Sequence, residues 1–294
     1  MSRAPDPPLP LAGVIDSHCH LDPGPRAPSA GREAEAEGGM IEARVARRDS
    51  PSTDELLARG RAAGIVGFVV VGVGETPHEA RHAVATARAH RDVVAAIGVH
   101  PHDARLADEA TVAELEALAA DPRVVAVGEI GLDFHYDRSP HDVQRAVFRR
   151  FVAVARAVRK PIVIHTRSAG QEALAILEEE GARDLGGVIH CFSEDVAFAR
   201  RALDLGFDLS FSGIVTFKTA TAIQEVARMA PAERILVETD APYLAPVPQR
   251  GKTCEPAMVV HTARYLAALR GVTPEELARV SADNTLRRFP ALRS

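Results

Sequence analysis

The sequence has no tryptophan, only three cysteines among 294 residues, and no apolar run of the length that a bilayer requires. So few cysteines, odd in number, argue against a secreted protein held together by disulfides and favour a reducing compartment. The first eleven residues are interrupted by four prolines and contain no signal-peptide core. The sequence therefore predicts a cytoplasmic protein with no membrane partner.

A basic surface is also missing. The chain has 35 Lys and Arg residues against 40 Asp and Glu residues, which gives a formal net charge of −5. This balance argues against a protein that coats nucleic acid through a broad positive face. It leaves open an enzyme that holds a single phosphate through bound metal ions.

Short β-branched runs alternate along the chain with segments of helical spacing. The predicted strands are residues 14–15, 65–71, 93–97, 124–127, 161–164, 187–189, 207–211 and 234–237, and clear helices are 111–120, 142–159 and 171–180. This alternation is typical of a parallel sheet covered by helices. Because eight strands fit a closed barrel, and no Gly-rich dinucleotide fingerprint follows the first strand, we predict an α/β fold, a (β/α)8 TIM barrel in a single domain.

The expected domain organisation is simple. We expect a flexible N-terminal lead-in over residues 1–12 and a barrel domain over residues 13–294. Residues 24–51 form an inserted loop after the first strand, longer than most such connections. We interpret this loop as a solvated, partly helical insertion, with a lid over the site as the alternative. Helices are expected to begin at capping boxes formed by Ser52 with Glu55 and by Thr273 with Glu276.

Six side chains that can bind metal stand at the ends of the apolar runs. They are His18, His20, Glu129, His165, His190 and Asp240. Residues more than 220 positions apart can meet only if the strands that carry them end at one place, as they do at the C-terminal face of a parallel barrel. Each of the six taken singly could be structural, but together they predict a metal-dependent hydrolase.

The motifs around these residues resemble one family. They are His18-Cys-His20-Leu-Asp22, Gly98-Val-His100-Pro-His102, Gly128-Glu129-Ile-Gly-Leu-Asp133, His165-Thr-Arg167, His190-Cys-Phe-Ser193 and Glu238-Thr-Asp240-Ala-Pro-Tyr. In this order, from about Val14 to Phe289, the chain resembles the TatD-type metal-dependent hydrolases, the TatD deoxyribonuclease family of the amidohydrolase-like superfamily. The resemblance implies a (β/α)8 barrel with a dinuclear metal centre that cleaves phosphodiester bonds of DNA.

The resemblance also implies how the two metals are held. One would be bound by His18, His20, Glu129 and Asp240, and the other by Glu129, His165 and His190. Two cations about 3.5–4 Å apart can stabilise both the attacking and the leaving oxygen of a displacement. We predict Asp240 and Glu129 as the catalytic residues, with Asp240 orienting the attacking water and accepting its proton.

Further residues have weaker assignments. We predict that His100 hydrogen-bonds the substrate phosphate, and that Arg167 pairs either with a phosphate or with a nearby carboxylate. Asp133 and Glu238 are expected behind the ligands, where they would fix a histidine tautomer. His102 is expected on a solvated loop.

Four histidines with two carboxylates suit Zn²⁺ or Mn²⁺, whereas Mg²⁺ prefers oxygen ligands, although the family is commonly described as Mg²⁺-dependent. We therefore predict two divalent cations per chain, Mg²⁺, Mn²⁺ or Zn²⁺. The expected partner is a nucleic-acid substrate, DNA or RNA, attacked as by an exonuclease on single-stranded ends, and a monomer is favoured. The alternative is hydrolysis of another ester or amide bond on the same barrel, as by an aminoacyl-RNA deacylase or a small-molecule amidohydrolase.

Overall fold

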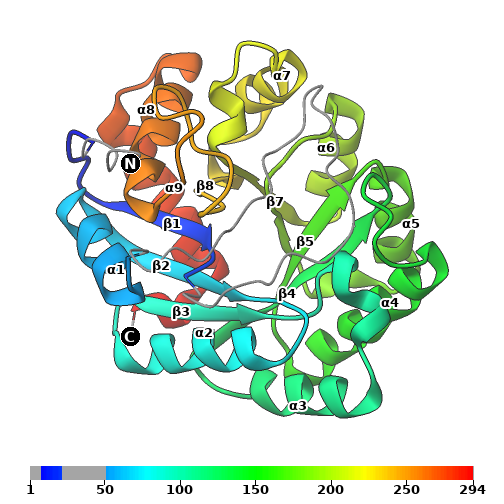
Figure 1. The fold of residues 1–294 in the computed structure, drawn as a ribbon. Coiled ribbons are helices and arrows are strands. Elements are labelled where there is room, and N and C mark those ends of the chain that lie inside the picture. Colours follow the sequence, from blue (N-terminus) through cyan, green and yellow to red (C-terminus); the bar gives the residue numbers. More distant parts are fainter. Residues whose placement is uncertain (1–7, 22–50, 294) are drawn as a thin grey trace.

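The structure is a computed structural model, which describes residues 8–21 and 51–293. Eight parallel strands form one sheet whose order follows the chain, and helices surround it (Figure 1). The strands are β1 (Val14–Cys19), β2 (Ile65–Gly72), β3 (Val93–Ile97), β4 (Val124–Asp133), β5 (Ile162–Arg167), β6 (Gly187–Ile189), β7 (Phe207–Phe211) and β8 (Ile235–Val237). The predicted (β/α)8 TIM barrel is confirmed.

The helices on the outside of the barrel follow the strands in turn. They are α1 (Thr53–Ala62), α2 (His78–Ala89), α3 (Glu109–Ala119), α4 (His141–Val158), α5 (Gly170–Glu179), α6 (Val196–Asp204), α7 (Thr221–Met229), α8 (Val259–Arg270) and α9 (Pro274–Arg288). Short 3-10 helices lie between them: η1 (Pro101–Leu106), η2 (Ala182–Asp184), η3 (Gly213–Thr216), η4 (Ala232–Arg234), η5 (Pro256–Met258) and η6 (Pro290–Arg293). Ser52 and Glu55 form the predicted capping box of α1, and Thr273 caps α9 by accepting the Glu276 N–H. Within the described part of the chain, no helix combines the length and the apolar composition that a membrane crossing needs.

Two expected features fall largely outside the described residues. The insertion at 24–51 lies there except for its last residue, as does the lead-in at 1–12 except for residues 8–12. Four strands are longer than predicted: β2 continues by one residue to Gly72, and β1, β4 and β5 continue past the apolar run to Cys19, Asp133 and Arg167. In the sequence, the polar residues in these extensions look like the end of a strand. In the structure, the backbone stays paired with the neighbouring strand, and the polar side chains face the barrel mouth.

Apolar residues fill the barrel interior below the mouth. One cluster joins alternate strand residues such as Val69, Val71 and Leu236 to Phe289 and Leu292 from the C-terminal end of the chain. A larger cluster packs the outer faces of the strands against the helices. Because the interior is packed, polar chemistry is restricted to the C-terminal ends of the strands, which we call the mouth.

The barrel closes between β1 and the segment after β8. The Asp240 N–H donates to the His18 carbonyl at 2.9 Å, and the His20 N–H donates to the Ala241 carbonyl at 2.7 Å. Below these bonds, the fully buried Asp16 carboxylate accepts the Thr239 N–H at 2.9 Å and the Thr239 hydroxyl at 2.6 Å. Burial raises the pKa of Asp16 to about 8. We call this set of contacts the seam.

Candidate metal centre

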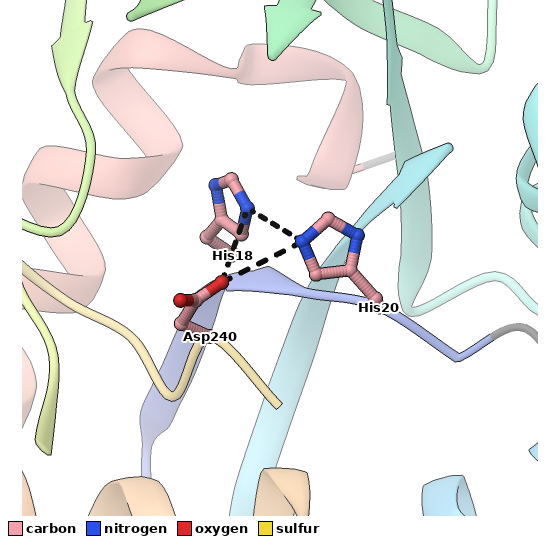
Figure 2. Close-up of side chains that lie close together, drawn as sticks. All are labelled: His18, His20 and Asp240. Carbon is pink, nitrogen blue, oxygen red and sulfur yellow. Dashed lines mark hydrogen bonds and ion pairs between the residues drawn. The ribbon is translucent and has the colours of Figure 1, made fainter. Parts of the chain in front are cut away.

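The seam places three of the predicted ligands together. His18 on β1 and His20 directly after this strand point towards each other, and Asp240 faces them from the segment after β8 (Figure 2). The two histidine Nε2 atoms lie 3.3 Å apart, and Asp240 Oδ1 lies 3.7 Å from His18 Nε2 and 3.5 Å from His20 Nε2. Asp240 adopts φ 59°, a left-handed conformation that Asp tolerates better than most residues. Backbone closure of the barrel therefore positions these side chains.

Glu129 on β4 completes this group from the opposite side. Its Oε2 lies 3.5 Å from His18 Nε2 and 3.8 Å from His20 Nε2. In a tetrahedral site with bonds of about 2.1 Å, ligand atoms lie about 3.4 Å from one another. The separations of 3.3 to 3.8 Å that join the two histidines to each other, to Glu129 and to Asp240 match that spacing. The donor set and its size therefore fit a divalent cation.

A second group forms around the other oxygen of Glu129. His165 Nδ1 on β5 lies 2.9 Å from Glu129 Oε1, and His190 Nε2, directly after β6, lies 3.4 Å from it. Burial raises the pKa of the Glu129 carboxyl. The surrounding His190, His100 and His165 lower this pKa by more than burial raises it, so that it falls well below its usual range. One ionised carboxylate thus faces two sets of nitrogen ligands, which is the arrangement that a bridging ligand requires.

A glycine two residues after Glu129 allows this close approach. Gly131 has φ +142°, and a Cβ at this position would overlap the backbone carbonyl of His165 on the neighbouring strand. A side chain there would push β4 away from β5 and separate Glu129 from His165. The Gly-Glu-Ile-Gly motif of the sequence is therefore part of the geometry of the site.

Carboxylates stand behind the second group, as expected. Asp133 Oδ2 lies 3.1 Å from His165 Nε2, and Glu238 Oε1 lies 2.8 Å from His190 Nδ1. Burial lowers the pKa of both rings, but the carboxylates outweigh it and raise the pKa of His165 to about 9 and that of His190 to about 10. In the first group, His20 Nδ1 instead faces the Val71 carbonyl at 3.0 Å. Each contact leaves the other ring nitrogen turned to the site.

His100 lies beside Glu129 and His165 in a group that could hold a metal ion, but its hydrogen bonds favour a role as a donor over a role as a ligand. Its Nδ1 accepts the backbone N–H of His102 at 3.1 Å, so the neutral ring carries its proton on Nε2. Burial lowers the pKa of His100 to about 3, which keeps the ring neutral. The Nε2–H points into the site, 3.4 Å from Glu129 Oε1. This geometry suits the predicted contact with an oxygen of a substrate.

The expectation that His102 lies on a solvated loop is wrong. Its side chain is only 13% exposed, and its Nε2 lies 2.9 Å from Asp133 Oδ2, the oxygen that also faces His165. The contact joins residues 31 positions apart, which local sequence does not reveal. Arg167 at the end of β5 lies over the Tyr136 ring, with its guanidinium carbon 4.6 Å from the ring centroid.

Three residues that support the site were not predicted from the sequence. Asp16 accepts hydrogen bonds across the seam, and the Gln144 side-chain amide on α4 bonds the backbone N–H and carbonyl of Asp133. Tyr136 stacks against Arg167. The sequence could have indicated Asp16, because a carboxylate inside an apolar strand must have a partner. It could also have indicated Tyr136, an aromatic residue that lies between His135 and Arg138 just after the end of a strand.

A barrel of this topology with four histidines and two carboxylates gathered at its mouth defines a metal-dependent hydrolase. The chain belongs to the family described as TatD related DNase, which matches residues 15–290.

Named relatives span most of the chain. It is 38% identical over 282 residues to a Mycobacterium tuberculosis protein named uncharacterized metal-dependent hydrolase TatD, a match that covers 94% of this chain and 97% of that one. It is 34% identical over 242 residues to a Rahnella protein named 3'-5' ssDNA/RNA exonuclease TatD, covering 80% and 91%. The solved structure of the Escherichia coli TatD homolog YjjV is similar with a TM-score of 0.78 at 25% identity, covering 95% and 98%.

Proposed function

We propose that this chain hydrolyses phosphodiester bonds of nucleic acid, DNA or RNA, acting as an exonuclease on single-stranded ends with two divalent cations. The observation that carries this proposal is the position of Glu129, whose two oxygens face two separate groups of ligands. The first cation would be held by His18, His20, Glu129 and Asp240. The second would be held by Glu129, His165 and His190.

A pair of divalent cations, when bound, supplies positive charge for the phosphate oxygens and lowers the pKa of a water molecule. The protein positions the other groups. Burial raises the pKa of Asp240, but His190, His20 and His18 lower this pKa by more than burial raises it. The carboxylate is therefore ionised at neutral pH. An ionised carboxylate at the edge of the first group can orient a water molecule and accept its proton.

Two further side chains face the substrate in this proposal. The His100 Nε2–H, held neutral by burial, donates to a phosphate oxygen. Arg167, two residues after His165 on β5, faces the same side of the strand and offers charge-assisted hydrogen bonds. Both lie on the side of the second group, so the substrate would extend across the mouth towards β4 and β5.

The nucleic-acid substrate is supported by one relative, the Rahnella protein named as a 3'-5' ssDNA/RNA exonuclease. It is also consistent with the acidic net charge, since a strand end bound at a metal centre needs no broad basic surface.

The test is hydrolysis measured side by side on four substrates: a labelled single-stranded DNA oligonucleotide, its RNA counterpart, bis(p-nitrophenyl) phosphate and an aminoacyl ester. We expect cleavage of the phosphodiesters that depends on added Mn²⁺ or Mg²⁺, stops with chelator, and shortens the labelled strand progressively from one end. Hydrolysis of the aminoacyl ester without cleavage of any phosphodiester would contradict the proposal and favour the ester-bond alternative.

A further inference from the structure

The loop between β4 and α4 carries basic and aromatic side chains along the mouth beside His165. The half-buried Tyr136 ring is at its centre, with the guanidinium carbon of Arg167 4.6 Å and that of Arg138 5.5 Å from the ring centroid. The His102 ring packs edge-on against Tyr136 at 5.4 Å. Such distances are those of cation–π and aromatic contacts, so Tyr136 fixes the position of the Arg167 guanidinium.

Arg167 differs from other arginines nearby. Arg145 on α4 also lies over an aromatic ring, that of Phe134, but its guanidinium is paired with Glu172. Within residues 8–21 and 51–293, the Arg167 guanidinium forms no hydrogen bond or ion pair, and it contacts the Tyr136 ring. A guanidinium that stacks through its face leaves its N–H edges available, in the geometry that a phosphate accepts.

The same carboxylate positions this loop and the metal centre. Asp133 Oδ1 accepts the backbone N–H groups of His135 and Tyr136, each at 3.0 Å, while Oδ2 faces His165. Arg167 follows His165 by two strand residues, or about 7 Å along the strand. That distance is comparable with the step between successive phosphates of a single nucleic-acid strand.

We propose that Arg167 binds the phosphate next to the scissile one, with Tyr136 as its positioning residue, so that a strand with two consecutive phosphodiesters binds more tightly than a single phosphodiester. This inference rests on the proposed function and adds a subsite to it. The ligand is the flanking phosphate of an oligonucleotide, held by the guanidinium edge that stacking on Tyr136 leaves open.

The test compares a trinucleoside diphosphate with a dinucleoside monophosphate, which lacks the flanking phosphate. For the trinucleoside, Arg167→Ala should raise KM about 10–100-fold and change kcat less than about threefold, because a charge-assisted hydrogen bond is lost. For the dinucleoside, the increase in KM should be at least about tenfold smaller. Tyr136→Leu should raise the trinucleoside KM about 3–10-fold, and Tyr136→Phe should restore it, because the ring face remains.

Arg145→Ala is the matched control, since it removes an arginine stacked on the same loop but outside the mouth, and it should leave both KM values unchanged. Metal content and thermal midpoint are measured for every variant to verify folding. Equal KM increases on both substrates for Arg167→Ala, no increase on the trinucleoside, or no effect of Tyr136→Leu would overturn the subsite alone. Failure of the wild-type enzyme to cleave either substrate would instead overturn the proposed function, and the subsite with it.

Inorganic phosphate distinguishes a general anion site from a strand subsite. Inhibition by inorganic phosphate is measured with the trinucleoside at a concentration equal to its KM for each variant. If Arg167 recognises the flanking phosphate of a strand, phosphate should inhibit the wild type and Arg167→Ala to a similar degree. Inhibition that disappears in Arg167→Ala would show that the residue binds free phosphate, and would contradict recognition of a continuous strand.

Discussion

The two halves of the candidate metal centre are built differently. On the β1 side, His18, His20 and Asp240 are held by backbone bonds across the seam and by the buried Asp16–Thr239 contact. On the β5–β6 side, each histidine has a carboxylate behind it, Asp133 or Glu238. Glu129 is shared between them. One half is therefore organised by closure of the barrel, and the other by pairs of charged side chains.

This difference predicts different behaviour towards protons. Burial lowers the pKa of His18, so its ring is neutral and ready for a cation. His165 and His190, with pKa values raised to about 9 and 10, hold protons at neutral pH until a cation displaces them. The first half is thus prepared for binding, while in the second half proton and cation compete.

The largest expected effect comes from removing the carboxylate of Asp240, which we propose as the catalytic group of the first half. Asp240→Asn keeps the size of the side chain but removes its negative charge and its ability to accept a proton. Turnover of the oligonucleotide should fall by about 10²–10⁴-fold, while the circular dichroism spectrum and the thermal midpoint stay close to those of the wild type. Turnover near the wild-type value would mean that Asp240 has no such role.

The second half should be sensitive to the carboxylates behind its histidines. Asp133→Asn and Glu238→Gln remove groups that orient His165 and His190, so affinity for one of the two cations should weaken about 10–100-fold. Affinity for the other cation, held mainly by the seam, should change much less. Metal titration with elemental analysis separates the two. Equal weakening at both sites would show that the halves are not independent.

The third expected effect is a pH dependence confined to one half. As the pH rises from 7 towards 9, His165 and His190 lose their protons more readily, so affinity for the second cation should rise by up to about tenfold per pH unit for each proton displaced. The first cation should bind with little proton release. Calorimetry of the cation-free protein in buffers of different ionisation enthalpy measures both. The comparison fails if the two binding events release the same number of protons.

Much of the fold and of the arrangement of the candidate site could be predicted from the sequence, because the strands are short and sharply bounded. β3, β6 and β7 begin and end where predicted, since they are flanked by glycine, a charged residue, histidine or serine. The six side chains that we propose as ligands could be predicted to lie together because each stands at or just after the end of such a run. The ends of β1, β4 and β5 could not, because a polar residue that faces the mouth looks the same in sequence as one that leaves the sheet.

Contacts between strands and loops far apart in sequence could not be predicted. The His102–Asp133 contact and the stacking of Arg167 on Tyr136 each join residues about thirty positions apart on different elements. Sequence spacing defines the face of one strand, but it does not define which loop side chain reaches across to it. The tautomer of His100 likewise depends on a turn geometry that only the coordinates show.

Anomalous diffraction from crystals grown with Mn²⁺ tests the central claim most directly. The account predicts two peaks about 3.5–4 Å apart, one among His18, His20, Glu129 and Asp240, the other among Glu129, His165 and His190. A single peak, or peaks away from Glu129, would contradict it.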